Sequence, residues 1–496
     1  MTAAAVPAAS PASTGEQSGV RLARSRRNAE LSLLLLAMVL VAAYSAMIEA
    51  KALDTITGDF WIPAAALGLV FLGLHLVIRW LAPFADPALL PAVALLNGIG
   101  VGFLRRYDLA QAAPAERADL AIFAGTGGRQ LAWTLASVVL AAALLAILRD
   151  HRTLSRYAYT LGLAGIVLVM IPAVLPGRFS EINGAKLWII VPGLGQIQPG
   201  EFAKLALLTF FAYYLVRKRE VLSLASRRVL GIDFPRGRDL GPVLVVWLVS
   251  LMVLVFEKDL GTSLLYFGMF VVTLYIATER VSWLLIGLIL FFGGAYLAYL
   301  LGSTVGGPFA NFYDRAQIWL DPFAEPYDRG YQLVQGLLTL GTGGLFGAGP
   351  GGGQPTLLPE VQTDFIFAGI GEEIGLFGLS ALLVVYLLIV ERGLRAALAV
   401  RDSFGKLLAG GLAFTLGLQV FVIVGGISKL IPLTGQTTPF LSAGGSSLMA
   451  NWLLIAVLLR VSDGARRPVT GGGSAARPAG APPEQLHGAP TEVIRP

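Results

Sequence analysis

Carboxylates stand at unusual positions in this apolar chain. In the segment PEVQTDFIFAGIGEEIG, residues 359–375, Asp364 comes directly before an apolar stretch, and Glu372 and Glu373 follow about two helical turns later. A carboxylate at a helix N-terminus can cap free N–H groups, which is the plain explanation of Asp364; it can also take up a proton as a general base. The two glutamates lie inside the apolar stretch, where an ionised group is costly unless it is paired or faces water.

Other polar side chains also border apolar stretches. Glu201 and Lys204 are three residues apart and share a helix face, so an ion pair, with each other or with a neighbouring helix, is the simpler explanation. Asp259 lies in a short turn, where it can cap the helix that follows. Ser446 and Ser447 belong to a run of small residues that allows close helix packing and could also line a polar cleft.

A glycine-rich segment, GTGGLFGAGPGGGQP at residues 341–355, precedes the acidic motif. Such a segment could cradle a phosphate, but it lacks the GK[ST] sequence and follows no expected strand, so it is not a P-loop. We expect a flexible loop that follows the surface.

The composition is that of a membrane protein. Of the 496 residues, 55% are hydrophobic and 14% charged, against roughly 25% charged in soluble domains, and the mean hydropathy is +0.72. The absence of cysteine excludes disulfides and thiolate sites. The three histidines, His75, His151 and His487, are too far apart in the sequence to suggest a zinc site or a catalytic triad. We expect no nucleic-acid partner.

The apolar segments predict an all-α, polytopic membrane protein, since a transmembrane helix needs about 20 apolar residues. We predict a membrane domain over residues 30–465, with a large extracellular loop at 302–364, between disordered cytoplasmic tails at 1–29 and 466–496. The expected transmembrane helices number about 12 and lie at 31–49, 61–80, 88–104, 131–148, 157–175, 201–216, 240–256, 260–278, 282–301, 365–390, 407–426 and 438–460.

Basic residues set the expected orientation, because cytoplasmic loops are enriched in arginine and lysine. The basic clusters precede the first span, separate the fourth from the fifth, the sixth from the seventh and the tenth from the eleventh, and follow the last. With twelve spans all of them fall on one side, so both termini are expected in the cytoplasm. The loop around Arg105, Arg106, Arg117 and Arg129 falls on the other side and weakly violates the rule.

Five segments together resemble one family. In order, NGAKLWI (183–189), QPGEFAKL (198–205), DLGTSLL (259–265), PEVQTDFIFAGIGEEIG (359–375) and PLTGQTTPFLSAGGSS (432–447) are similar to the signature segments of the SEDS proteins, for shape, elongation, division and sporulation. The resemblance extends over roughly residues 30–465. Within the family, which includes RodA and FtsW, the variants are most similar to RodA-type elongation proteins.

The resemblance implies a peptidoglycan glycosyltransferase in the cytoplasmic membrane. Such an enzyme polymerises lipid II, a disaccharide-pentapeptide on undecaprenyl diphosphate, at the outer face of the membrane. It works with a class B penicillin-binding protein that cross-links the strands. The acid of the family motif falls on Asp364, and Gln362 replaces the usual histidine.

The implied reaction inverts an α-linked sugar diphosphate to a β-linked polymer in one displacement. The acceptor hydroxyl must lose a proton, for which Asp364 is the candidate base. The departing diphosphate needs positive charge, for which Lys186, Arg315 and then Arg329, or a divalent cation such as Mg²⁺ or Mn²⁺, are candidates. We expect further substrate contacts from Gln362, Ser446 and Ser447, and a structural polar network of Glu201, Lys204, Glu372, Glu373 and Asp259.

Two other functions are compatible with the same residues. Twelve spans with embedded acids also describe transporters, so a flippase for a lipid-linked precursor is the main alternative. A scaffold that recruits cell-wall enzymes would leave all the acids with structural roles. The sequence does not choose between elongation and division.

Overall fold

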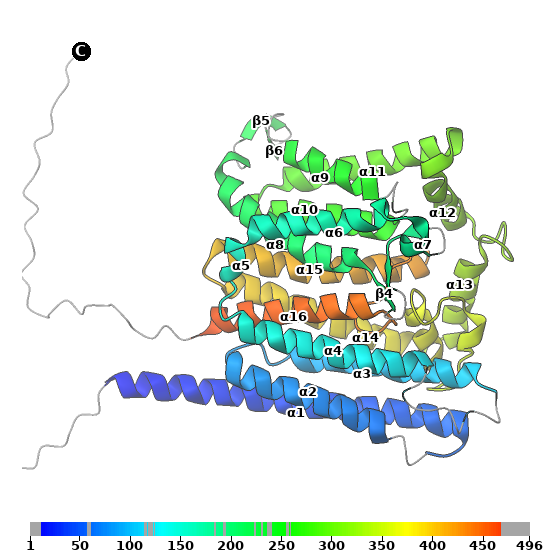
Figure 1. Ribbon diagram of the computed structural model, residues 1–496, viewed down its shortest axis with the longest axis horizontal. Coiled ribbons are helices and arrows are strands. Elements are labelled where there is room, and N and C mark those ends of the chain that lie inside the picture. The colour runs from blue at the N-terminus through cyan, green and yellow to red at the C-terminus, as the bar shows by residue number, and fades with distance from the viewer. Residues whose placement is uncertain are drawn as a thin grey trace, which may run out of the picture.

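The computed structural model describes residues 11–56, 61–113, 117, 123, 125–182, 185–191, 195–222, 225–229, 232–235, 241–253, 257 and 259–467. Long helices lie side by side in one bundle, with their axes roughly parallel (Figure 1). These long helices are α1 (Pro11–Leu53), α2 (Trp61–Leu81), α3 (Leu89–Gln111), α4 (Gly125–Ile147), α6 (Ala158–Val174), α8 (Pro199–Leu222), α9 (Gly241–Met252), α10 (Leu260–Thr278), α11 (Val281–Thr304), α14 (Ile366–Ala399), α15 (Ser403–Ile427) and α16 (Gly445–Arg466).

Short elements connect the long helices. They are the helices α5 (Thr153–Arg156), α7 (Gly177–Ser180), α12 (Ala310–Leu320) and α13 (Tyr331–Gly343), with 3-10 turns η5 (Gly307–Phe309) and η6 (Pro355–Leu357). Three antiparallel hairpins pair β1 (Glu181–Ile182) with β2 (Ala185–Lys186), β3 (Ile189–Val191) with β4 (Gly195–Ile197), and β5 (Ala225–Val229) with β6 (Ile232–Pro235).

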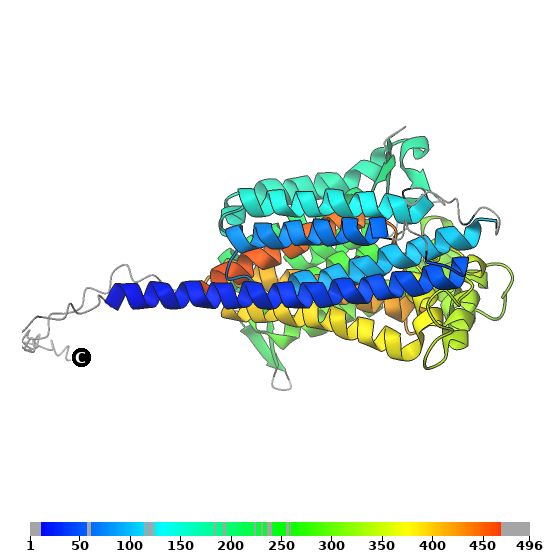
Figure 2. The same ribbon diagram turned by 90° about the horizontal axis from the view of Figure 1, so that it is seen from below.

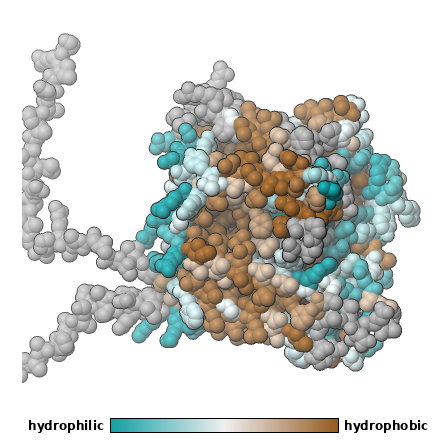
Figure 3. Space-filling model, in the orientation of Figure 1, coloured by the Kyte–Doolittle hydropathy of each residue, from teal (hydrophilic) through white to brown (hydrophobic). Residues whose placement is uncertain are grey.

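On the face shown in Figure 3, an apolar band covers the middle of the bundle, between two more polar ends. In the described part of the chain, nine helices are long and apolar enough to cross a membrane. The most apolar windows of α3 and α16 are 83% buried, whereas that of α11 is 17% buried. Helices α3 and α16 therefore form the centre of the bundle, and α11 presents most of its surface to lipid. The expected all-α, multi-pass membrane fold is confirmed.

Each of the twelve predicted spans falls on a long helix of the structure. Three predicted spans, on α6, α8 and α9, fall outside these nine. Helix α6 has 17 residues, the described part of α9 has 12, and α8 carries Glu201 and Lys204 within its apolar stretch. In α8, polar groups that are paired inside the protein lower the local hydropathy.

The predicted disordered tail at residues 1–29 is wrong over part of its length. Helix α1 begins at Pro11 and extends beyond the bundle at one end (Figure 2). Within it, Arg27 is 1% exposed and donates to Glu30 at 2.6 Å, and Glu30 also contacts His75 of α2 at 2.7 Å. This buried group anchors α1 to α2, an interaction between distant residues that composition does not reveal. The expected tail beyond residue 467 lies outside the described residues.

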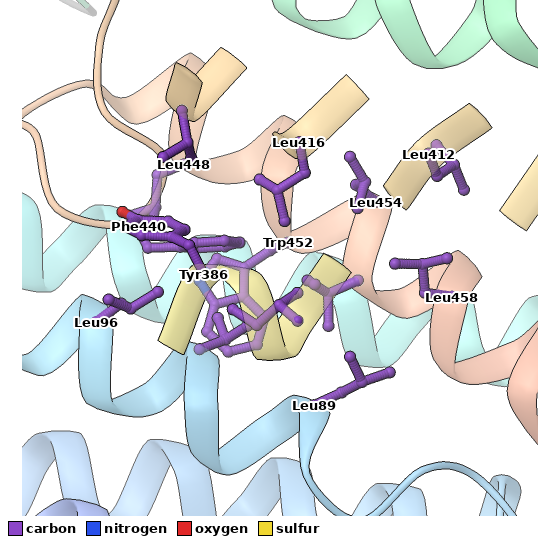
Figure 4. Packing of buried hydrophobic residues seen from close by; sticks show 14 of the residues in the cluster. Leu89, Leu96, Tyr386, Leu412, Leu416, Phe440, Leu448, Trp452, Leu454 and Leu458 are labelled. Carbon is purple, nitrogen blue, oxygen red and sulfur yellow. The ribbon is translucent and has the colours of Figure 1, made fainter. Parts of the chain in front are cut away.

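The core is built mainly around α16. Trp452 is fully buried, stacks on Phe71 with ring centroids 5.8 Å apart and meets Phe440 edge-on at 6.0 Å. Figure 4 shows Tyr386 of α14 in the same region as Trp452 and Phe440. The Tyr386 hydroxyl donates to the carbonyl of Pro439. The chain before α16 is thus held deep among the helices.

The two ends of the bundle differ. Helices α7, α12 and α13 lie at one end, and α5 and the β5–β6 hairpin lie at the other, where α1 begins and α16 ends (Figure 1). We call these the α12–α13 end and the arginine-rich end. The predicted long loop at 302–364 forms much of the α12–α13 end. It contains α12 and α13, so it is an ordered cap rather than a structureless connection.

Candidate active site

Asp364 lies in a tight turn at the α12–α13 end, two residues before α14 begins. The backbone N–H groups of Thr363 and Phe365 both donate to the carbonyl of Glu360, which has a positive φ of 52°. Phe365 is fully buried against Gly336 of α13, where an added Cβ would stand 2.2 Å from the ring. The buried Phe365 fixes the turn, and the side chain of Asp364 stays partly exposed.

A second segment, residues 428–444, holds the turn from the other side. The Ser442 hydroxyl donates to the carbonyl of Thr363, and the N–H of Ala443 donates to the carbonyl of Gln362 at 2.8 Å. Two of the five signature segments, far apart in sequence, therefore meet through one side-chain and one backbone hydrogen bond next to Asp364.

Arg315 of α12 lies next to Gly435, as the Asp364 carboxylate does. Its guanidinium donates to the carbonyl of Leu433 at 2.7 Å and to the side chain of Asn311 at 3.0 Å. A Cβ added to Gly435 would stand 3.6 Å from an Asp364 oxygen and 3.7 Å from an Arg315 nitrogen. Both charged groups therefore border one small space over Gly435, which has a φ of 72°.

Asp259 forms the buried floor of this region as the N-cap of α10. It accepts from the N–H of Thr262 at 3.0 Å and from the Thr262 hydroxyl, which in turn accepts from the Gln436 amide at 2.9 Å. Gly261 permits this contact, because an added Cβ there would lie 2.3 Å from the Gln436 side chain. The capping interpretation of Asp259 is confirmed by this geometry, which also brings it into electrostatic range of Asp364 and Arg315.

The surroundings of Asp364 favour its neutral form more than water would. Burial and the nearby charge of Glu360 raise its pKa, Arg315 opposes them, and the resulting pKa is about 7. Among the described residues, no group donates a hydrogen bond to the Asp364 carboxylate. A carboxylate that is half ionised near neutral pH and has no bound donor is suited to accept a proton from a ligand.

Glu201 and Lys204 form the predicted ion pair within α8. They are 2.6 Å apart, and Lys204 also donates to Gln419 of α15 at 3.0 Å. Gln419 in turn donates to the carbonyl of Thr437 at 3.2 Å, so the pair supports the segment that carries Gly435. Its role is to hold α8, α15 and that segment together.

Glu373 belongs to a different buried group. Its carboxylate is 0% exposed, lies 3.3 Å from Arg106 of α3 and accepts from the Tyr44 hydroxyl of α1 at 3.3 Å. Arg106 also donates to the carbonyl of Gly353 at 2.7 Å. The loop arginine that weakly violated the orientation rule is thus the partner of an embedded acid.

The glycine-rich segment lies against α14 beside these acids. Helix α14 is interrupted at Gly375, with φ 68° and ψ −176°, and the N–H groups of Ala348 and Gly349 donate to the carbonyls of Glu372 and Glu373 at 2.9 Å. An added Cβ at Gly347 would lie 2.1 Å from the Glu373 carbonyl. The expected flexible surface loop is therefore a packed strap, and its glycines allow the backbones to approach closely.

The residues of the predicted polar network accordingly make four separate sets of contacts. Glu201 and Lys204 bind α15, Asp259 caps α10, and Glu373 pairs with Arg106. Glu372 accepts from the backbone N–H of Gln354 at 3.0 Å in the strap.

The predicted substrate-binding residues differ in position. Arg315 and Gln362 are beside Asp364, and the buried Oε1 of Gln362 has no hydrogen-bond partner among the described residues. Lys186 lies partly exposed in the β1–β2 hairpin next to α7, at the same end of the bundle. Arg329 instead binds Glu325 at 2.7 Å and Asp314 at 3.1 Å on the exposed surface.

Ser446 and Ser447 are buried at the start of α16. Ser446 accepts from the N–H of Gln198 at 3.0 Å, and Ser447 accepts from the side-chain amide of Asn451. Both hydroxyls thus have partners inside the protein: Ser446 joins α16 to the chain before α8, and Ser447 is bonded within α16.

Sequence reasoning missed Gln436 and Glu360. The Oε1 atom of Gln436 is buried without a hydrogen-bond partner among the described residues, although its amide binds Thr262. Both residues stand in segments already singled out, Gln436 in PLTGQTTPF and Glu360 in PEVQTDF. Position beside the acid, which only the fold gives, was the missing signal. The described residues contain no cluster of three or more acidic or histidine side chains that could hold a metal ion.

The fold and the site define a multi-pass membrane protein with a partly exposed carboxylate at one end of the bundle. The profile of the cell cycle protein family that unites FtsW, RodA and SpoVE matches residues 87–467. The chain therefore belongs to this family, the SEDS proteins.

Within the family the chain is similar to RodA. It is 49% identical over 449 residues to the peptidoglycan glycosyltransferase RodA of Mycobacterium tuberculosis (strain ATCC 25618 / H37Rv), covering 90% of this chain and 92% of that one. It is 35% identical over 313 residues to the stage V sporulation protein E of Bacillus subtilis (strain 168), covering 63% of this chain and 79% of that one. The predicted similarity to RodA-type members is confirmed.

Solved structures share the fold. The RodA crystal structure from Thermus thermophilus matches with a TM-score of 0.51 at 26% identity, covering 77% of this chain and 98% of that one. A chain from a peptidoglycan synthase complex that coordinates polymerization and crosslinking matches with a TM-score of 0.57 at 28% identity, covering 77% of this chain and 99% of that one.

Proposed function

We propose that this chain is a peptidoglycan glycosyltransferase that polymerises lipid II into glycan strands during cell elongation. The observation that carries the proposal is Asp364. This chain belongs to a family in which relatives are named peptidoglycan glycosyltransferase. Asp364 is a partly exposed carboxylate with a pKa of about 7, beside an arginine and two residues before α14 begins.

In the proposed reaction, the acceptor sugar hydroxyl attacks the anomeric carbon of the donor. Asp364 takes the hydroxyl proton as the new carbon–oxygen bond forms, and the bond between that carbon and the undecaprenyl diphosphate breaks with its electron pair going to the diphosphate. The single displacement inverts the α-linked donor to a β-linked product. Asp364 then releases its proton to water, which restores the base.

Positive charge must stabilise the leaving diphosphate. Arg315 is the first candidate because it borders the same space as Asp364, and Lys186 is the second because its partly exposed side chain lies at the same end. Arg329 ranks third, since Glu325 and Asp314 already neutralise it. Gln362 and Gln436 each offer a buried oxygen that could accept from a sugar hydroxyl or amide. We assign Ser446 and Ser447 a supporting role, in holding the start of α16.

Orientation follows from the proposal. The α12–α13 end would face outward from the cytoplasmic membrane, and the arginine-rich end would face the cytoplasm together with both termini. The partner would be a class B penicillin-binding protein that cross-links the strands. A divalent cation, Mg²⁺ or Mn²⁺, would be held mainly by the diphosphate oxygens, as magnesium commonly is at phosphate groups.

The experiment is polymerisation of lipid II by the purified full-length protein, with and without the partner, and with Mg²⁺, Mn²⁺ or EDTA. We expect polymer from the wild type and almost none from Asp364→Asn, which keeps the size of the side chain and removes the base. Near-normal polymer from a folded Asp364→Asn protein would refute the assignment of the base.

One observation favours a lipid transporter as the second candidate. Helix α14 is interrupted at Gly375, and interrupted helices mark binding sites in many transporters. A transporter would move labelled lipid II across liposome membranes that contain the protein, with no polymer formed. Any effect of Asp364→Asn on transport would then be independent of polymerisation.

A further inference from the structure

A cavity of about 220 Å³ opens at the arginine-rich end, far from Asp364. This volume is well above the roughly 10–15 Å³ that one water molecule needs. The walls come from three places: the turn between α4 and α5, the turn between α14 and α15, and the last turn of α16. The lining includes five arginines, namely Arg149, Arg152, Arg401, Arg460 and Arg467.

The lining has an excess of positive charge. Asp150 and Asp463 are the acids of the lining, so five arginines less two aspartates leave a formal charge of +3. Asp402 binds His151 and Arg152 next to the lining, and counting it still leaves +2. The cavity therefore suits an anion.

Part of this charge stabilises the fold. Arg460, 3% exposed, donates to the carbonyls of Leu81 and Leu145, and its Nε has no hydrogen-bond partner among the described residues. Asp463 lies 3.7 Å from Arg460 and accepts from Arg467 at 2.7 Å. Cations near helix C-termini are expected from the helix dipole alone, and Arg460 fits that role.

Arg149 and Arg401 follow the C-terminal ends of α4 and α14, where the helix dipole also favours positive charge, but they differ from Arg460 in having no partner in the described part of the chain. Both are exposed in the lining, and within the described ranges their side chains make neither an ion pair nor a hydrogen bond. They line the cavity from two different turns, one after α4 and one after α14. Two unneutralised guanidinium groups are available to a ligand.

His151 fixes the two turns relative to each other. It is 4% exposed, and its Nε2 lies 2.8 Å from Asp402, the residue that caps α15 by accepting from the Gly405 N–H at 2.7 Å. Burial alone would raise the pKa of Asp402, but the hydrogen bond from His151 and the N–H of Gly405 lower it overall, so Asp402 stays ionised. The distance between Arg149 and Arg401 is thus set by a built contact.

Apolar residues adjoin the arginines on the same turns. Ile147, at the end of α4, is 82% exposed, and Leu398, at the end of α14, is 83% exposed. Exposed side chains of this kind border the apolar band, where lipid chains would contact them. A ligand with an anionic head and apolar chains matches both parts.

We propose that this cavity binds a phosphate group, supplied by the headgroup of an anionic phospholipid of the adjoining leaflet. Arg149 and Arg401 would contact the phosphate oxygens, since guanidinium groups match them with paired hydrogen bonds. Basic pockets between transmembrane helices are a recurrent form of lipid headgroup site. The site is separate from the proposed glycan chemistry and does not rest on it.

The test is native mass spectrometry of the full-length protein in detergent, titrated with phosphatidylglycerol or phosphatidylcholine of the same acyl chains. We expect the wild type to retain phosphatidylglycerol preferentially. Arg149→Gln/Arg401→Gln should weaken phosphatidylglycerol binding by roughly 10- to 30-fold, because each basic residue near an anionic lipid contributes about 1 kcal/mol. Both residues are exposed, so the melting temperature of the variant should match that of the wild type without lipid.

The matched control is Arg24→Gln/Arg156→Gln, which removes two exposed arginines at the same end but outside the cavity lining. It should bind phosphatidylglycerol as the wild type does. A second arm adds inorganic phosphate: competition by phosphate at Arg149 and Arg401, without any preference for phosphatidylglycerol, would support the phosphate site and assign it to a soluble anion. Equal loss of binding in both double variants, or no loss in either, would overturn the proposal.

Discussion

Two acids of one motif, Asp364 and Glu373, have opposite surroundings although nine positions separate them. Glu373 is fully buried and has Arg106 and Tyr44 as partners from two other helices. Asp364 is partly exposed, accepts no hydrogen bond within the described part of the chain, and has Arg315 nearby but already bound to Leu433. Glu373 therefore stabilises the fold through its partners, whereas Asp364 is available to a ligand.

The difference shows how one motif can combine structure and chemistry. Glu373 and the strap hold α14 where it is interrupted at Gly375, because unpaired backbone groups within a membrane need partners. That support places the start of α14, and with it Asp364, against the segment that carries Gly435. Mutations at either acid should therefore reduce activity, and stability measurements are needed to tell them apart.

The largest expected effect separates the two acids directly. Asp364→Asn should lower lipid II polymerisation by about 10²- to 10⁴-fold, the usual contribution of a general base, while the melting temperature in detergent stays at or above that of the wild type. The activity and the melting temperature should be measured on the same preparation. A parallel fall in melting temperature would place Asp364 with Glu373 as a structural acid.

Glu373→Gln should show the reverse pattern, because its main effect should be a large loss of stability. Removing one partner of a buried ion pair commonly costs about 3–5 kcal/mol, because the other charge is left without compensation. The double variant Glu373→Gln/Arg106→Gln should lose less than the sum of the two single variants, since neither charge is then left alone. Additive losses in a denaturation series would show that the pair is not coupled.

The prediction of this contrast from sequence was partial, for reasons visible in particular residues. Apolar stretches predicted the location of the long helices. The position of Asp364 directly before such a stretch predicted that it lies just before the start of a helix. Arg106 could not be recognised as the partner of Glu373, because 267 positions separate them and only the packing of α3 on α14 brings them together. Arg329, equally basic, was overrated because its local acids Glu325 and Asp314 were not weighed.

The pH dependence should sharpen the comparison further. With a pKa of about 7, Asp364 gains its negative charge as the pH rises through 7, so polymerisation should increase with pH and level off about one unit above. The free energy of unfolding should change with pH in the opposite direction. Because the pKa of Asp364 is raised in the folded state, its contribution to stability is fully present below 3.8, its pKa in the unfolded chain, and is lost as the pH rises through 7. Asp364→Asn should abolish both dependences.

Neighbouring charges should move this profile in opposite directions. Arg315→Gln removes a charge that lowers the pKa of Asp364, so the midpoint of the activity profile should shift to higher pH. Glu360→Gln removes a charge that raises it, so the midpoint should shift to lower pH. Profiles of polymer formation for the two variants, measured against the wild type, check the signs; shifts in the same direction would contradict the electrostatic account.

The smallest effect is expected at Arg329, which tests whether proximity to Asp364 or mere positive charge matters at this end. Its partners Glu325 and Asp314 are exposed, and exposed ion pairs contribute little to stability because water and salt screen them, so Arg329→Gln should leave the melting temperature nearly unchanged. It should also leave the activity profile in place, whereas Arg315→Gln removes the same charge beside the carboxylate and should shift it. If the two variants lost polymerisation equally, the diphosphate would be held by the summed charge of the α12–α13 end rather than by a contact next to Asp364.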